Sequence, residues 1–361
     1  MNKREFIQSA IIAGLSAKEL LSSSNLPKKL SSTRGFEGKK FWVWVHPNDK
    51  ESESVIDARY ASWRESGIQG IFFEADSEKH FLMARKNGIS THRWMWIMNR
   101  PDKSLMQNHP GWFSVSRKGQ SCVTNPPYVD YYRWLCPNKP EVLNYLEAQV
   151  SESVSKPYVD GIHLDYIRFC DVILPVNLWD KYKIKQNAEL PEYDFCYCND
   201  CRNAYQKIYG IDPLKMEHPD QSSSWRRFRY NSITKIVNHL AETAKEYGKP
   251  ISAAVFPTPD IAKRIVRQDW VNWNLDAVFP MIYHGFYKEN VQWIGEAASE
   301  GIAALHSKFP LYAGIFLPDF SNYAEVEKGI KAALDNGAAG VSVFGQINDH
   351  VLTVIKKFSS S

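Results

Sequence analysis

A carboxylate and an imidazole stand two positions apart in an apolar stretch, VDGIHLDYIRF, at residues 159–169. If this stretch is a β-strand, His163 and Asp165 share one of its faces, and the apolar residues between and beside them share the other. A carboxyl group at the end of such a strand can act as an acid, a base or a nucleophile. We therefore predict that Asp165 is catalytic, with a structural pairing to Arg168 or His163 as the alternative.

Cleavage of a glycosidic bond needs two carboxyl groups, one acting as the acid and the other as the nucleophile or base. Glu74 is our first choice for the second group, because it projects from the end of another predicted strand rather than from a loop. Asp76, Asp260 and Asp319 lie at or just beyond strand ends and are the alternatives.

Other polar and aromatic residues lie near the ends of predicted strands, where they could bind or orient a substrate. The predicted substrate-binding residues are His46, Trp94, Trp96, His163, Tyr166, Arg168, Tyr283, His284 and Gln346. Aromatic residues make 13% of the chain, and such rings either stack on ligands or fill a core. We expect stacking from Trp94, Trp96 and Trp112, whereas His163, one layer deeper than Asp165, could equally be a core histidine.

A cysteine motif, C-x-C-x-x-C, ends at residue 201. Its three thiolates, from Cys196, Cys198 and Cys201, suit a structural tetrahedral zinc site that needs one more ligand. We predict Cys170, directly after the apolar stretch, as the fourth ligand. The other two cysteines, Cys122 and Cys136, compete for this role. Disulfide bonds are the competing interpretation, because export from the cytoplasm would permit them.

Eight short apolar runs recur along the chain, and helix-like segments separate most of them. The runs are residues 40–47, 68–75, 90–99, 159–169, 250–258, 275–284, 310–318 and 338–346, and the helix-like segments are 54–67, 139–156, 232–248, 290–301 and 322–337. Alternation repeated eight times is typical of a (β/α)8 TIM barrel, an α/β fold. An open doubly wound sheet is the alternative, but the glycine-rich phosphate loop that usually follows its first strand is missing from the sequence.

Two connections are much longer than the others, at residues 100–138 and 170–231. Both follow predicted strands on the side where barrel enzymes build their active sites. Long loops in compact domains are usually functional, so we predict that these two form the walls of a cleft after strands 3 and 4. Residues 39–361 then form one barrel domain.

The N-terminal residues 1–38 resemble an export signal followed by a linker. A basic pair, Lys3 and Arg4, precedes a short apolar run and a serine-rich stretch, which is the order of a signal peptide. The Lys-Arg-x-Phe sequence resembles a twin-arginine signal, and an amphipathic helix is the alternative. We expect a periplasmic or extracellular protein whose mature part has no membrane span. A formal net charge of +4, with no basic block, argues against a nucleic-acid partner.

The block from Asp160 to Phe169 resembles the D-G-x-H-x-D-Y-x-R-[YF] motif of the glycoside-hydrolase-like 10 family, with apolar residues at x. A second block, from Gln268 to Tyr283, resembles that family's Q-D-W-x-x-W and P-M-x-Y motifs. The resemblance covers most of residues 40–346. It implies a (β/α)8 barrel, export from a bacterium and a carbohydrate substrate.

Two weaker resemblances refine the chemistry. Family 18 chitinases carry a general-acid Glu where this chain has Ile167, and aspartates where it has His163 and His284. Without that Glu, the chain cannot use their acid, so Asp165 would need a partner from another strand. The cysteine motif resembles the zinc cluster of family 42 β-galactosidases, in which one distant cysteine completes the site.

We therefore predict an exported glycoside hydrolase that cleaves a poly- or oligosaccharide with a pair of carboxylates. A carbohydrate-binding protein on a degenerate barrel is the alternative, motivated by Ile167. A third hypothesis is a barrel enzyme of another class, such as a deacetylase or lyase. The sequence lacks H-E-x-x-H or a comparable cluster, which argues against a catalytic metal. We expect structural zinc and no organic cofactor.

Overall fold

The computed structural model of the protein describes residues 35–359. Most of the predicted export signal and linker, residues 1–38, therefore lies outside the described residues. Within 35–359, no helix is both long enough and apolar enough to cross a membrane.

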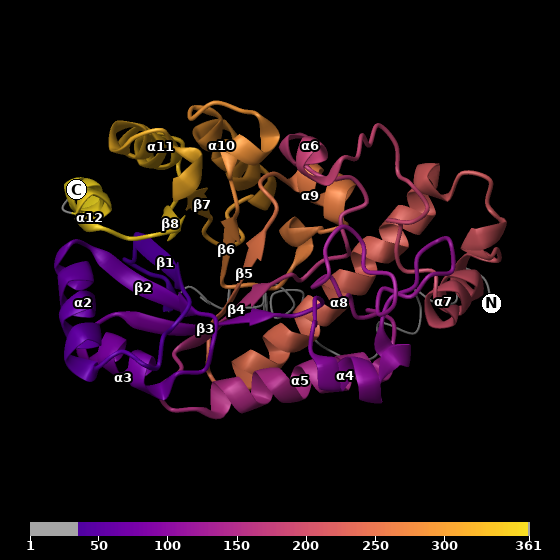
Figure 1. Ribbon diagram of the computed structural model, residues 1–361, viewed down its shortest axis with the longest axis horizontal. Helices are drawn as coiled ribbons and strands as arrows, with labels where there is room; N and C mark the ends of the chain where they lie inside the picture. The colour runs from indigo at the N-terminus through magenta and orange to yellow at the C-terminus, as the bar shows by residue number, and fades with distance from the viewer. Residues whose placement is uncertain (1–34, 360–361) are drawn as a thin grey trace, which may run out of the picture. The chain divides into compact units, whose positions relative to one another are not determined.

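Eight parallel strands form one sheet in the order β6-β5-β4-β3-β2-β1-β8-β7. They are β1 (Phe41–Val45), β2 (Ile68–Phe73), β3 (Ser90–Trp96), β4 (Gly161–Asp165), β5 (Ile251–Val255), β6 (Ala277–Pro280), β7 (Tyr312–Phe316) and β8 (Gly340–Phe344). The ring closes between β6 and β7, where the N–H of Val278 donates to the carbonyl of Pro310 over 3.0 Å and that of Ile282 donates to Gly314 over 2.8 Å. The predicted (β/α)8 barrel is confirmed, with one strand inside each predicted run (Figure 1).

Helices connect the strands, and most of them cover the outside of the barrel (Figure 1). The helices are α2 (Glu53–Glu65), α3 (Glu78–Lys86), α4 (Lys103–Asn108), α5 (Pro140–Ser155), α6 (Trp179–Tyr182), α7 (Asn199–Tyr209), α8 (Ser223–Glu246), α9 (Pro259–Val266), α10 (Trp293–Leu305), α11 (Tyr323–Asp335) and α12 (Asp349–Ser359). Of these, α4, α6 and α7 belong instead to the two long loops. The five predicted helical segments correspond to α2, α5, α8, α10 and α11, and α5 and α8 lie side by side. The prediction did not include α3, α9 and α12, although α9 and α12 are clearly amphipathic, so their helical period was a usable signal.

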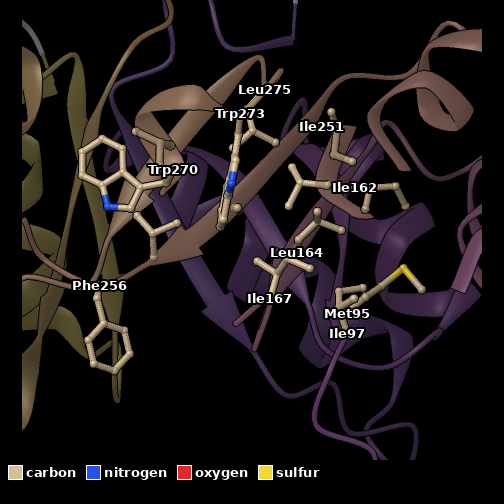
Figure 2. Close-up of a cluster of buried hydrophobic side chains, with 14 of the residues drawn as sticks. Met95, Ile97, Ile162, Leu164, Ile167, Ile251, Phe256, Trp270, Trp273 and Leu275 are labelled. Atoms are coloured by element: carbon tan, nitrogen blue, oxygen red, sulfur yellow. The ribbon is translucent and has the colours of Figure 1, made fainter. Parts of the chain in front are cut away.

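Alternation along β4 separates two hydrophobic layers. Ile162 and Leu164 point outward into the apolar layer between sheet and helices, where Trp270 and Trp273 also lie (Figure 2). The inside of the barrel holds a different cluster, made largely of rings such as Trp42 and Phe72. Large rings fill the interior of the barrel along the strands. The space open to a ligand therefore lies at the C-terminal ends of the strands.

Candidate active site

A cavity of about 390 Å³ lies at the C-terminal ends of the strands. Trp44, Trp94, Asp165 and Phe344 reach it from β1, β3, β4 and β8. The predicted long loops supply further lining, from Tyr128, Tyr131 and Tyr132 after β3 and from eight residues between Tyr166 and Tyr182 after β4. The prediction that these loops form the walls of a cleft is therefore confirmed.

Asp165 is the last residue of β4 and lies in the lining with only 8% of its surface exposed. Its carboxylate accepts hydrogen bonds from the backbone N–H of Tyr166 over 2.6 Å and from the indole N–H of Trp94 over 2.9 Å. Burial raises the pKa of Asp165 above its ordinary value, although these two hydrogen bonds and the positive charge of Arg168 act in the opposite direction. A carboxyl group with a raised pKa is suited to donate a proton near neutral pH.

The hydrogen bond from Trp94 gives a pH-dependent prediction. The bond stabilises the ionised carboxylate and so lowers the pKa of Asp165. Trp94→Phe removes the donor, so the pKa should rise further. If Asp165 acts as the acid, activity falls as pH rises through its pKa, and the alkaline limb of the pH–kcat/KM profile should move to higher pH. Trp96→Phe is the matched control, because Trp96 lines the same cavity without bonding Asp165; equal shifts in both variants would contradict the assignment.

A second carboxylate in the lining is Asp171, which accepts a hydrogen bond from the guanidinium of Arg168 over 2.8 Å. Both side chains are buried. The guanidinium carbon of Arg168 also lies over two rings, at 4.7 Å from the centre of Trp134 and 5.1 Å from that of Phe256, positions in which aromatic faces attract a cation. The ion pair and the rings therefore hold Arg168 and Asp171 in fixed places in the lining that they share with Asp165.

Tyr166 links these groups through an unusual backbone conformation. Its φ of 47° lies in the left-handed region, which is uncommon for a residue other than glycine and tends to cluster at functional sites. This turn lets its N–H reach the Asp165 carboxylate, while its ring packs 4.6 Å from that of Trp96. The chain thus turns directly after the candidate acid.

Four buried cysteine thiols meet away from this cavity, from Cys136, Cys196, Cys198 and Cys201. Their sulfur atoms all lie within 4.8 Å of one another, and four thiolates around a zinc ion lie about 3.8 Å apart. All six cysteines of the chain are free thiols. The cluster could therefore hold a metal ion.

The prediction of Cys170 as the fourth ligand was wrong. Cys170 directly follows β4, and its thiol faces the carbonyl of Asp171 at 3.7 Å. Cys136 takes the place instead, with its sulfur 3.4 Å from those of Cys198 and Cys201. Spacing could not reveal this, because Cys136 belongs to the loop after β3 and the motif belongs to the loop after β4.

Residues 76–308 of the chain match the family model described as Glycosyl hydrolase-like 10. The chain belongs to this family. The match includes Asp165, Asp171 and the four clustered cysteines, whereas His46 and Glu74 precede it. Membership supports a glycosidase-type function. None of the curated proteins compared with the chain matched it in sequence.

Solved structures with similar folds are also glycoside-cleaving domains by their descriptions. The PgaB (BpsB) glycoside hydrolase domain from Bordetella bronchiseptica gives a TM-score of 0.63 at 10% identity, over 87% of this chain and 95% of that one. The β-amylase catalytic domain from Paenibacillus polymyxa gives 0.56 at 11% identity, over 89% and 98%. A β-galactosidase from Marinomonas ef1 gives 0.59 at 10% identity, over 89% and 59%. At these identities the likeness shows the barrel fold alone.

The second block shared with the glycosyl hydrolase-like 10 family supports the cavity from outside. The Gln268 amide donates to the carbonyl of Ile167 over 3.2 Å, and its oxygen accepts from the backbone N–H of Phe256 over 2.9 Å. These bonds tie the segments after β4 and β5 together, next to Arg168. Gln268 is thus a positioning residue for the cavity wall in this member of the family.

Glu74, the predicted partner of Asp165, is not in the lining of the cavity. Its carboxylate bonds the Nδ1 atom of His46, and His46 does line the cavity. The negative charge of Glu74 still contributes to the raised pKa of Asp165. Glu74 thus acts on the site through its bond to His46 and through its charge, whereas Asp171 is the second carboxylate in the lining.

Six of the predicted substrate-binding residues line the cavity: His46, Trp94, Trp96, Tyr166, Arg168 and Tyr283. His163 does not, because it is fully buried inside the barrel, where it accepts a hydrogen bond from Trp44 over 2.9 Å and is stacked on Phe72. Burial lowers the pKa of His163 well below its ordinary value. It is therefore a neutral core histidine that orients Trp44.

Three further predicted residues lie elsewhere. His284 begins a short 3-10 helix and packs against Phe320, with ring centres 4.8 Å apart. Trp112 is stacked on His109 at 4.0 Å in the loop after β3. Gln346 lines a neighbouring cavity. Each of these residues follows a strand or lies in a long loop. At each of them the chain has already turned away from the main cavity, so the side chain does not line it.

Sequence reasoning missed most of the tyrosines around Asp165. The cavity is lined by Tyr128, Tyr131, Tyr132, Tyr182 and Tyr287 in addition to the two predicted ones. The cluster YVDYYRW at residues 128–134 was a usable signal, since aromatic residues are concentrated there in a loop. Asp171 could also have been found, because it follows Asp165 in the loop directly after the same strand.

Proposed function

We propose that the protein hydrolyses glycosidic bonds of a poly- or oligosaccharide, with Asp165 as the acid. The observation that carries the proposal is the position of Asp165, a buried carboxyl group with a raised pKa at the end of β4, in the lining of a cavity rich in aromatic rings. Aromatic faces bind the apolar faces of sugar rings and leave the hydroxyl groups to polar neighbours.

The proposed chemistry uses the two carboxyl groups in the lining. Asp165 would donate its proton to the glycosidic oxygen, so that the bond between this oxygen and the anomeric carbon breaks. Asp171, held by Arg168, would act as nucleophile or as the base that takes a proton from water. The His46–Glu74 pair is the alternative base, because His46 shares the lining.

A hydrolysis screen tests this proposal. The purified protein is incubated with a panel of bacterial, algal and host polysaccharides, and the release of reducing ends is measured. We expect release from at least one of them, and NMR of the first product will show whether the anomeric configuration is retained or inverted. Binding without release would contradict the enzymatic proposal.

A carbohydrate-binding role is the second candidate, and one observation favours it. Ile167 occupies the position where family 18 chitinases carry their acid, and it is fully buried in the core. No side chain at that position can therefore protonate a leaving group. The screen separates the two candidates, because a binding protein would retain a polysaccharide without shortening it.

Export and structural zinc also belong to the proposal. Residues 1–38 would direct the protein to the periplasm or the outside of the cell, and N-terminal sequencing of the mature protein would identify the cleavage site. The cluster of Cys136, Cys196, Cys198 and Cys201 would hold zinc as a closed structural site. Hydrogen bonds from the N–H of Val115 to Cys196, over 3.4 Å, and from Asn138 to Cys201, over 3.2 Å, support thiolates there.

A further inference from the structure

A second cavity, of about 720 Å³, lies beside the first. The two share three lining residues, Trp44, His46 and Phe344, at the ends of β1 and β8. The side chains of these three residues therefore separate the two cavities, and each side chain contacts both of them. The volumes of both fall within the range of cavities that bind small organic ligands.

Loop lengths explain why the cleft continues on this side. Only residues 46–52 separate β1 from α2, and only residues 345–348 separate β8 from α12. The opposite side is walled, because the loop after β4 packs its short helix η3 (Val176–Leu178) against η7 (His284–Tyr287). A ligand too long for the first cavity can therefore extend over β1 and β8.

The second cavity offers the groups that sugar binding uses. Trp63 contributes the edge of a ring that is 8% exposed, and Gln346 and Asp349 supply hydrogen-bonding groups. Gln346 and Asp349 are exposed, and within residues 35–359 neither side chain has a hydrogen bond or an ion pair. Arg59 also lines the cavity, but its guanidinium is paired with the Glu51 carboxylate, so the groups left to bind sugar hydroxyls are the Gln346 amide and the Asp349 carboxylate.

We propose that the second cavity binds additional sugar units of a chain-like substrate, whose other units occupy the first cavity beside Asp165. This inference rests on the proposed function and adds to it the length of the substrate and the direction in which it lies. Its chain crosses the mouth of the barrel past His46, toward α2 and α12. Units bound in the second cavity then contribute binding energy to the reaction at Asp165.

A chain-length experiment tests the inference. Ladders from disaccharide to octasaccharide are prepared by partial acid hydrolysis of the polysaccharides in the screen, and kcat/KM is measured for each length. We expect kcat/KM to rise by at least about tenfold from the shortest to the longer chains. Ser62→Trp, which fills the second cavity from the exposed face of α2, should abolish this rise and leave the disaccharide rate unchanged.

Ser54→Trp is the matched control, because Ser54 is an exposed serine on the same helix that does not line the cavity. It should keep the chain-length dependence, and equal melting temperatures will show that both variants fold. Equal kcat/KM on short and long chains, or an unchanged rise in Ser62→Trp, would overturn the inference alone. Failure to hydrolyse any polysaccharide in the screen would instead overturn the proposed function.

Discussion

Asp165→Asn should lower kcat by about a thousandfold or more, because the amide cannot donate a proton to a leaving group. The substitution changes one atom of a side chain with two defined hydrogen bonds, to Tyr166 and Trp94. Affinity for an oligosaccharide should change little, since the aromatic rings of the lining remain. The measurement is single-turnover release of reducing ends, with affinity from calorimetry.

Two matched variants make this result specific. Asp171→Asn tests the second carboxylate, and it should also reduce kcat strongly if Asp171 is the nucleophile or base. Glu74→Gln tests the carboxylate outside the lining, which bonds His46 and adds negative charge near Asp165, and it should have the smaller effect. Near-normal turnover by Asp165→Asn, with the fold confirmed by circular dichroism, would rule out Asp165 as the acid.

Cys136→Ala should remove the metal and destabilise the protein by about 4 kcal/mol or more, the range expected for loss of a structural metal. Cys136 is the one ligand of the four that comes from the loop after β3, so its loss removes the metal link between this loop and the motif after β4 and leaves backbone bonds such as that from the Tyr197 N–H to the Val115 carbonyl. The measurements are the metal content by mass spectrometry and the free energy of unfolding in urea.

Cys170→Ala is the control for this prediction, since it removes an equally buried thiol that lies outside the cluster. It should keep a full complement of metal and lose only the packing of one sulfur. Titration of thiols in the denatured, unreduced protein distinguishes a zinc site from disulfide bonds. Disulfide bonds would leave fewer than six reactive thiols. Metal-free wild-type protein, or full metal in Cys136→Ala, would contradict the zinc site.

The strands and the position of Asp165 could be predicted because both depend on local patterns. Each strand is a short apolar run, and alternation alone assigns Ile162 and Leu164 to one face and Asp165 to the other. The same rule placed His163 on the face that points into the barrel. It could not decide whether the side chain reaches the cavity or stays buried in the core. Only packing shows that Phe72 and Trp44 enclose its ring.

The partners of the predicted residues could not be found in this way. Glu74 and Asp165 both end strands, yet β2 ends where its carboxylate meets His46 rather than the cavity. Cys170 is nearer to the motif in sequence than Cys136, but Cys136 is nearer in space. Sequence separation carries little information here, because two long loops fold back over one barrel mouth.

The sequence by itself determined the barrel, the family and the strand from which the candidate acid projects, since periodicity and motif spacing are local properties of the chain. The tertiary structure alone decided that the tyrosines of the loop after β3 and Tyr287 line the cavity with Asp165, and that Cys136 completes the cysteine cluster. It also placed the second cavity beside the first. The physical reason is that these groups belong to different loops, and only the closed ring of strands sets the distances between the loops.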